Sequence, residues 1–228
     1  FKAMLGSSSI NSDGTSIGAS NTDVTFSDLE HAWLDNTTNS DGTRIGGPNG
    51  SAYNDKRLSY FGRLNYDFKE TYLLNATFRA DGSSTFHPDN QWGYFPSVSA
   101  GWVATNENFL SNSKIISFFK LRASWGQVGN QNAGAYQYLA PIQTKTTNYI
   151  FGNEEGVLTP GAYQYRLSNP ALKWETSEQT NIGFDARFFN NALTVNFDWY
   201  EKTNKDWLIL PPILATAGAD AAFINGGN

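Results

Sequence analysis

Only two histidines, His31 and His87, could act as imidazole bases in this chain. Both lie in predicted loops, and no Gly-x-Ser-x-Gly elbow accompanies them. They also form no zinc-binding pattern with neighbouring acids. The chain has no Cys, which excludes a thiolate nucleophile, a thiolate metal site and a disulfide framework. We therefore expect no catalytic residue, no cofactor and no metal site, and we predict that the chain is not an enzyme.

Hard oxygen ligands are concentrated in one further segment, where Asp81-Gly82-Ser83-Ser84 precedes Asp89 and Asn90. Carboxylate and hydroxyl oxygens are the ligands that Ca²⁺ takes in proteins. The bidentate Glu that completes an EF-hand loop is missing, however, and Asp-Gly is a common turn dipeptide. We therefore favour a plain turn over a calcium site.

The composition excludes several classes of protein. Aromatic residues make up 15% of the 228 residues, whereas charged residues reach only 16%. Disordered chains are poor in aromatic residues, so the composition excludes disorder. The formal net charge of −5 argues against nucleic acid as a partner. No run of about 18 or more apolar residues is present, which excludes a transmembrane helix.

Period-2 alternation is the dominant pattern along the chain. In residues 58–68, apolar residues and Gly occupy every second position from Leu58 to Phe68, and residues such as Arg63 lie between them. The same pattern predicts seven strands, at residues 1–9, 58–68, 72–81, 94–103, 119–127, 175–188 and 193–202. Each strand has one apolar face and one polar face with few charges. The fold class is therefore predicted to be all-β.

Most joins between these strands alternate between long and short, with short joins at residues 69–71 and 189–192, although 82–93 and 104–118 are close in length. Long joins rich in Asn, Gly and Ser are expected at residues 10–57, 82–93, 128–174 and 203–228. In an up-and-down sheet alternate joins lie at the same end, so one end carries the long loops. Outer-membrane barrels have this asymmetry, with long external loops and short periplasmic turns. We therefore predict a transmembrane antiparallel up-and-down β-barrel in which residues 1–228 form about seven strands.

Two other architectures remain open. A soluble carbohydrate-binding β-sandwich also alternates, although its outer face is usually rich in Lys and Glu, and here the polar faces carry mainly Ser, Asn, Thr and Gly. An outer-membrane barrel that acts as an adhesin or an enzyme would share the features described so far. Bacterial single-chain barrels have even strand numbers from about 8 upward. We therefore expect the chain to be a portion of a larger barrel.

Seven Arg and Asp residues inside the predicted strands fall on the polar face. On the lipid face a charge at mid-depth would cost about 2–4 kcal/mol. We therefore predict that these side chains face the lumen, where they pair with one another or with further parts of the protein. They are Arg63, Asp67, Arg79, Asp81, Arg122, Asp185 and Arg187.

Several short motifs stand in order between residues 57 and 206. They are Arg57–Tyr66 (RLSYFGRLNY), Phe78–Phe86 (FRADGSSTF), Trp92–Ser97 (WGYFPS), Leu121–Gly126 (LRASWG), Asn169–Thr176 (NPALKWET) and Asn181–Asp185 (NIGFD). Their order and spacing resemble those of the SusC/RagA-like family of TonB-dependent outer-membrane transporters of Bacteroidetes-type bacteria. Thr85 and His87 stand where family members often carry a basic residue and Gly.

The resemblance implies a barrel of about 22 strands with a plug domain inside. Family members import large nutrients, typically glycans or peptides, with a SusD-like surface lipoprotein as a lid and with energy from the TonB complex. We accordingly expect a multi-pass protein of the outer membrane, surrounded by outer-membrane lipid. By this resemblance the plug, the N-terminal domain, the TonB-contacting segment and the last strands of the barrel are expected to lie outside residues 1–228.

Five tyrosines lie in the predicted external loop 128–174. A Tyr ring offers an apolar face to a sugar ring and a hydroxyl group for a hydrogen bond. The residues are therefore candidates for contact with the ligand or the lid, and the alternative is packing of the loop on itself. They are Tyr136, Tyr138, Tyr149, Tyr163 and Tyr165.

The assignment of the two faces leads to a first prediction. Phe184→Arg, which places a charge on the lipid face, should impair barrel assembly much more than Asn181→Arg or Gly183→Arg, which place it on the polar face. The yield of folded, heat-modifiable barrel measures the effect. Equal yields from the three variants would contradict the face assignment.

Overall fold

The structure is a computed structural model that describes residues 1–18, 49–143, 148–149 and 159–227. In this part of the chain the helical elements are short 3-10 turns, and no helix is long and apolar enough to cross a membrane. The turns are η2 (Pro88–Asn90), η3 (Ala104–Asn106) and η4 (Ala215–Ala217). The described chain is therefore built on strands, as the alternation predicts.

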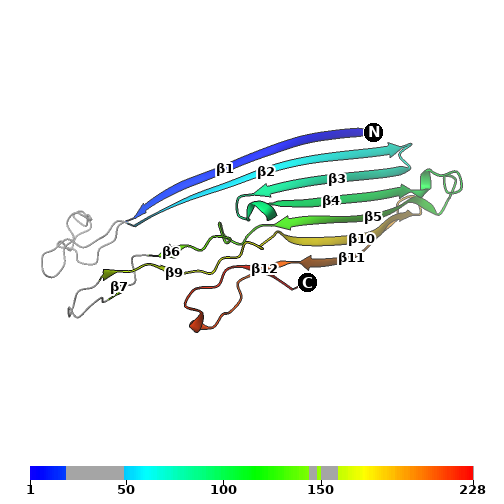
Figure 1. The fold of residues 1–228 in the computed structure, drawn as a ribbon. Coiled ribbons are helices and arrows are strands. Elements are labelled where there is room, and N and C mark those ends of the chain that lie inside the picture. The colour runs from blue at the N-terminus through cyan, green and yellow to red at the C-terminus, as the bar shows by residue number, and fades with distance from the viewer. Residues whose placement is uncertain (19–48, 144–147, 150–158, 228) are drawn as a thin grey trace, which may run out of the picture. The chain divides into compact units, whose positions relative to one another are not determined.

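Seven strands form one sheet in the order β1-β2-β3-β4-β5-β10-β11 (Figure 1). They are β1 (Lys2–Gly18), β2 (Asn49–Phe68), β3 (Tyr72–Ser83), β4 (Trp92–Val103), β5 (Ile116–Asn130), β10 (Glu175–Phe188) and β11 (Leu193–Lys205). The pairs from β2 to β11 are antiparallel. The sheet confirms the predicted up-and-down arrangement of seven strands.

The described chain divides into two compact units, Phe1–Ile10 with Lys56–Asn228, and Asn11–Asp55. The smaller unit contains the distal part of β1 and the first part of β2. A Cβ on Gly14 would lie 2.4 Å from the Tyr53 ring, so glycine lets that ring lie flat against the strand. The larger unit holds the other strands and the joins between them.

Two tight turns connect neighbouring strands at one end of the sheet. Lys69 and Glu70 both have positive φ (55° and 54°), and Thr71 N–H donates to the Phe68 carbonyl at 3.0 Å. Residues 189–192 form a second turn in which Asn190 and Asn191 have φ of 54° and 69°. Two successive residues of positive φ define the primed hairpin turn whose twist matches that of the flanking strands. Both joins stand where the sequence predicts short turns.

The register of the strands separates two faces. Along one row the adjacent residues, from β2 to β11, are Tyr66, Leu74, Ala100, Ala123, Ile182 and Trp199. The row one residue away on each strand consists of Asn65, Asn75, Ser99, Ser124, Asn181 and Tyr200. Because side chains alternate between the faces of a sheet, the first row belongs to an apolar face and the second to a polar face. These two names are used below for the two sides of the sheet.

The apolar face is exposed rather than packed in a core. Phe78, Ile182 and Phe197 lie on different strands of this face, and each is 52% exposed. Monomeric soluble proteins rarely expose a contiguous apolar surface that crosses so many strands. Hydrocarbon around this face would solvate it, so the surface is the one expected of a sheet in lipid.

One row of the apolar face changes from apolar to polar residues as it crosses the sheet. From β2 to β11 its members are Leu64, Ala76, Val98, Trp125, Thr180 and Glu201. Hydrogen-bonded rows run perpendicular to antiparallel strands, so a row remains at one membrane depth only if the strands stand upright. The change from Leu64 to Glu201 is the pattern expected of strands that are tilted, as they are in a barrel.

The observed strands extend beyond several of the predicted bounds, most of all between β1 and β2. β1 continues to Gly18 and β2 begins at Asn49, so the join predicted at 10–57 is shorter. Residues 10–18 and 49–57 lack the apolar alternation that marks a strand, which is why the sequence did not predict these extensions. The predicted loops 128–174 and 203–228 contain short strands, namely β6 (Ile142–Gln143), β7 (Asn148–Tyr149), β8 (Thr159–Pro160), β9 (Tyr163–Gln164), β12 (Trp207–Ile209) and β13 (Ile224–Gly226).

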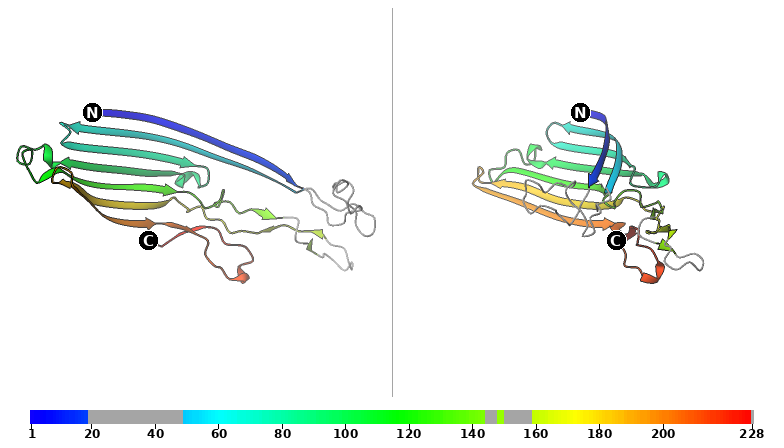
Figure 2. Two further views of the ribbon diagram at one scale, coloured as in Figure 1. Left: turned by 180° about the vertical axis from the view of Figure 1, so that it is seen from behind. Right: turned by 90° about the vertical axis from the view of Figure 1, so that its left-hand side faces the viewer.

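The joins that follow β3, β5 and β11 pack on one another. They lie at the end of the sheet opposite the tight turns (Figure 2). We call residues 84–91, 131–143, 161–174 and 206–227 the loop layer. Phe86, Ala133 and Leu172 form its buried core, with Trp174, Leu208 and Phe223 packed against it. The Trp174 ring also contacts Phe86 and Phe95, at centroid distances of 5.3 and 5.5 Å.

Carboxamide side chains tie the C-terminal segment to this core. Asn225 donates to the carbonyls of Lys173 and Asp206 and accepts from the Lys173 N–H, each at 2.9 Å. Asn169 donates to the Phe223 carbonyl at 2.8 Å. Three joins that are far apart in the sequence are therefore held in one arrangement.

Leu172→Ala should loosen the loop layer and leave the sheet intact. Leu172 is 1% exposed, and removing such a buried side chain costs about 2–5 kcal/mol. We expect limited proteolysis of the full-length protein to cut the loop layer faster, with unchanged heat-modifiability of the barrel. Leu167→Ala is the matched control, because Leu167 lies in the same segment and is 40% exposed. Equal protease resistance of the two variants would contradict a cooperative core.

Candidate functional site

The seven charged residues predicted to face a lumen all lie on the polar face. Arg122 on β5 is the centre of their largest network. Its Nε lies 3.3 Å from Asp185 on β10, and its Nη1 lies 2.5 Å from Asp198 on β11. One cation thus links three adjacent strands. Such exposed pairs add little to stability, so their main effect is to neutralise charge on this face.

Gly183 allows Arg122 to reach across β10. It is paired in register with Arg122 on one side and with Asp198 on the other. A Cβ at this position would lie 2.5 Å from the Phe197 carbonyl oxygen and 2.6 Å from the Asp198 Oδ1. The expectation that Gly183→Arg is tolerated as a polar-face variant is therefore wrong. Asn181→Arg remains the suitable comparison for Phe184→Arg.

The other predicted charged residues are engaged locally. Arg79 Nε donates to Asp81 at 2.7 Å, and its Nη2 donates to the Ser59 hydroxyl at 3.3 Å. Asp67 accepts the Glu70 N–H of the tight turn at 2.8 Å.

Two arginines of the polar face have no carboxylate partner among the described residues. Arg187 stacks over the Phe118 ring, at 5.2 Å from its centroid. Arg63 is exposed and has neither an ion pair nor a ring partner in that part of the chain. The polar face therefore carries both neutralised and free cations.

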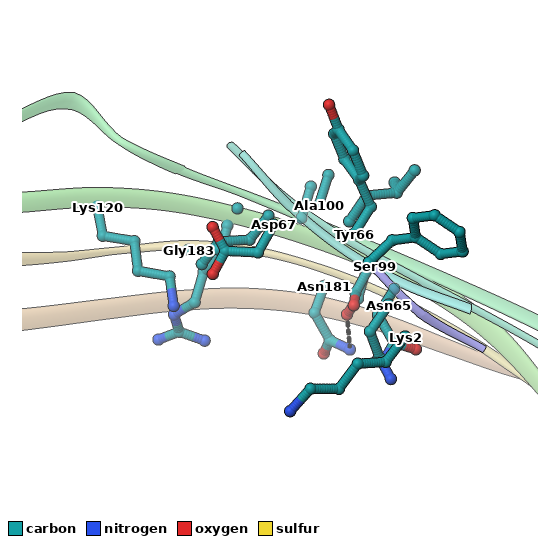
Figure 3. Close-up of a pocket in the computed structure, with 17 residues that line it drawn as sticks. Lys2, Asn65, Tyr66, Asp67, Ser99, Ala100, Lys120, Asn181 and Gly183 are labelled. Atoms are coloured by element: carbon teal, nitrogen blue, oxygen red, sulfur yellow. Dashed lines mark hydrogen bonds between the residues drawn. The ribbon is translucent and has the colours of Figure 1, made fainter. Parts of the chain in front are cut away.

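A hollow of about 690 Å³ lies on the polar face. Its lining includes the uncharged Asn and Ser side chains of the polar row, with Lys2 and Lys120 on either side in the view of Figure 3. Asn75 donates to Asn65, and Asn181 donates to the Ser124 hydroxyl at 3.2 Å. The surface along this row is uncharged and rich in hydrogen-bonding side chains.

The predicted tyrosine cluster is only partly brought together. Tyr136 and Tyr138 meet edge to face at 6.1 Å, and Tyr138 meets His87 in the same way at 5.6 Å. Tyr163 lies apart and donates from its hydroxyl to the Gln143 Oε1 at 3.4 Å.

The two remaining tyrosines contribute less to a common site. The backbone of Tyr165 pairs with Pro141 and Asp220. The side chain of Tyr149 and the whole of His31 lie outside the described residues. Ligand or lid contact by the five tyrosines stays a prediction.

The segment considered for calcium is occupied by protein contacts. Asp81 binds Arg79, and Asp89 lies 3.3 Å from His87. Across the described residues, no group of three or more His, Asp or Glu side chains could hold a metal ion.

Sequence reasoning did not single out Asp198, Gly183 or His87 as parts of these clusters. Asp198 occupies a polar position in the alternation of its strand, as Asp185 does in its own, so the pattern could have predicted that it lies on the polar face. The role of Gly183 depends on the register of three strands, and the contact of His87 with Tyr138 joins residues 51 positions apart along the chain. No periodicity of a single strand reports such contacts.

Gly183→Ala should destabilise the barrel by about 1–3 kcal/mol, because the added methyl group meets backbone and the Asp198 side chain. Urea unfolding of the full-length protein in detergent micelles measures the loss. Gly101→Ala is the matched control, since Gly101 is the opposite neighbour of Arg122 and its Cβ would meet the flexible end of Lys120 at 3.2 Å. An equal loss in both variants, or no loss in either, would contradict the proposed role of Gly183.

Known proteins share both the sequence and the arrangement of this chain. Residues 5–228 match the family model described as "TonB dependent receptor-like, beta-barrel". SusC of Bacteroides thetaiotaomicron is 41% identical over 155 residues, which is 66% of this chain and 15% of SusC. TonB-dependent receptor P3 of Formosa agariphila is 35% identical over 170 residues, 75% of this chain and 16% of that protein.

A solved structure agrees with these matches. The RagAB peptide transporter superposes with a TM-score of 0.79 and 29% identity, over 98% of this chain and 23% of the matched chain. The chain thus spans about a sixth of the length of its curated relatives. The all-β antiparallel fold and the resemblance to SusC and RagA are confirmed, and the chain belongs to the TonB-dependent receptor β-barrel family.

Proposed function

We propose that this chain forms part of the wall of an outer-membrane active transporter that imports large nutrients, either glycans or peptides. The match to SusC and to a structure described as a peptide transporter supports this function. The proposed transporter draws energy from the TonB complex and is covered by a SusD-like lipoprotein. Both partners would act through parts of the protein beyond residues 1–228.

The exposed apolar face is the observation that carries the proposal. A sheet with one face suited to hydrocarbon and the other lined by Asn, Ser and paired charges has the two surfaces that a membrane conduit needs. Transport of this kind makes and breaks no covalent bond. The side chains of the polar face then need only be hydrated and bind the cargo weakly, so that the cargo can pass along them.

The loop layer gives this transporter a formed entrance. Its buried core fixes the joins, and the edge-to-face rings of Tyr136, Tyr138 and His87 lie on this framework, each only partly buried. A fixed aromatic surface loses little conformational entropy when it binds a ligand. We therefore propose that this part of the loop layer contacts the ligand or the lid.

Uptake measurements in intact cells test the function. Cells that produce the full-length protein should accumulate labelled oligosaccharides or oligopeptides, and deletion of its gene or of TonB should abolish that accumulation. Cells whose inner-membrane potential has been dissipated should behave like the TonB deletion, because the proposed import step draws its energy from the inner membrane. Uptake that survives loss of TonB, or a protein extracted from cells without detergent, would contradict the proposal and favour an adhesin, an enzyme or a soluble sandwich.

A further inference from the structure

Arg166 of the loop layer carries a charge that no acid among the described residues neutralises. Its Nη2 donates to the Tyr136 carbonyl at 3.1 Å. Its Nε is buried and has no hydrogen-bond partner. No carboxylate of the described residues lies within ion-pair distance of it, whereas Lys173 of the same layer is paired with Asp206 at 3.0 Å. Unsatisfied buried polar groups are rare in folded proteins, and an absent ligand is one of their causes.

The backbone of Asp220 lies close to that of Arg166, but the Asp220 carboxylate does not form an ion pair with Arg166. Asp220 is held beside it by backbone hydrogen bonds, since Leu167 N–H donates to the Asp220 carbonyl at 2.9 Å and Asp220 N–H donates to the Tyr165 carbonyl at 2.7 Å. Its side chain is nevertheless exposed and forms no ion pair with Arg166. The fold therefore brings an acid close and still leaves the guanidinium without a carboxylate partner among the described residues.

The residue that anchors Arg166 has an unusual backbone. Tyr136 has a φ of 57°, in the left-handed region that side chains other than Gly rarely adopt. Its carbonyl accepts from Arg166 and from the Leu139 N–H at 3.1 Å each. Strained residues of this kind are concentrated at ligand-binding sites, where the surrounding structure holds them.

We propose that Arg166, with the rings of Tyr136 and Tyr138, forms a subsite for a carboxylate group of the imported ligand. This inference rests on the proposed transport function and names the chemistry of its cargo. A guanidinium binds a carboxylate through charge-assisted hydrogen bonds, and it is less strongly hydrated than an ammonium group. The half-buried position of Arg166 strengthens that attraction, and the segment whose backbone carbonyl binds Arg166 also carries the Tyr136 and Tyr138 rings, which offer an apolar surface to the carbon skeleton that bears the carboxylate.

Binding to the purified full-length receptor tests the subsite. The probes are a galacturonate trimer against its methyl ester, and a hexapeptide with a free C-terminus against its amide. We expect the charged member of one pair to bind about tenfold more tightly than its neutral counterpart, and Arg166→Gln to remove that difference. The pair that shows the preference identifies whether the carboxylate belongs to a sugar or to a peptide.

Two further variants make the result specific. Lys173→Gln removes a paired cation of the same layer and should keep the full preference for the charged probe. Arg166→Lys keeps the charge without the planar fork and should lose only part of the preference. Unchanged affinity of Arg166→Gln for the neutral probes would show that the loop layer is still folded.

The proposal is overturned if no charged probe is preferred, if no probe binds, or if Arg166→Gln keeps the preference. It is also overturned if Lys173→Gln loses the preference to the same extent. The transport function has a separate readout, because uptake that requires TonB can persist in a receptor that ignores carboxylates. A carboxylate preference without such uptake would instead overturn the transport function and leave the subsite standing.

Discussion

The absence of water in hydrocarbon is the constraint on which this structure depends. Each backbone N–H and C=O group in the membrane must be paired inside the protein, and antiparallel strands do this by pairing with their neighbours. Side chains then alternate between lipid and interior, which explains why Ile182 and Phe184 are apolar while Asn181 and Asp185 are polar. The low charge and high aromatic content of the chain follow from the same alternation.

The strands and their faces could be predicted from the sequence because lipid imposes a strict period. β10 covers Glu175–Phe188, the range that its alternation predicts. The tight turn at residues 189–192 was also expected, since Asn tolerates the positive φ that a primed turn requires. The charges on the polar face followed from the cost of placing them in hydrocarbon.

Contacts between distant segments could not be predicted in this way. The core formed by Phe86, Ala133 and Leu172 joins two predicted loops, and each residue alone looks like an ordinary loop residue. The requirement for Gly183 appears only when Arg122 and Asp198 are known to be its neighbours. In the loop layer both sides of a segment contact water or other loops. The sequence there has no regular alternation of apolar and polar residues that would reveal a strand or a site. Four of the five loop tyrosines are among the described side chains, and only Tyr136 and Tyr138 share a cluster.

Lipid accessibility along β10 tests the central claim most directly. Single cysteines can be introduced into this cysteine-free chain within the full-length protein and labelled with a nitroxide. Collision with oxygen reports exposure to hydrocarbon, and collision with a polar nickel chelate reports exposure to water. We expect labels at 182, 184 and 186 to collide with oxygen, and labels at 181, 185 and 187 to be shielded from it. Loss of this alternation, or its reversal, would contradict the assignment of the two faces.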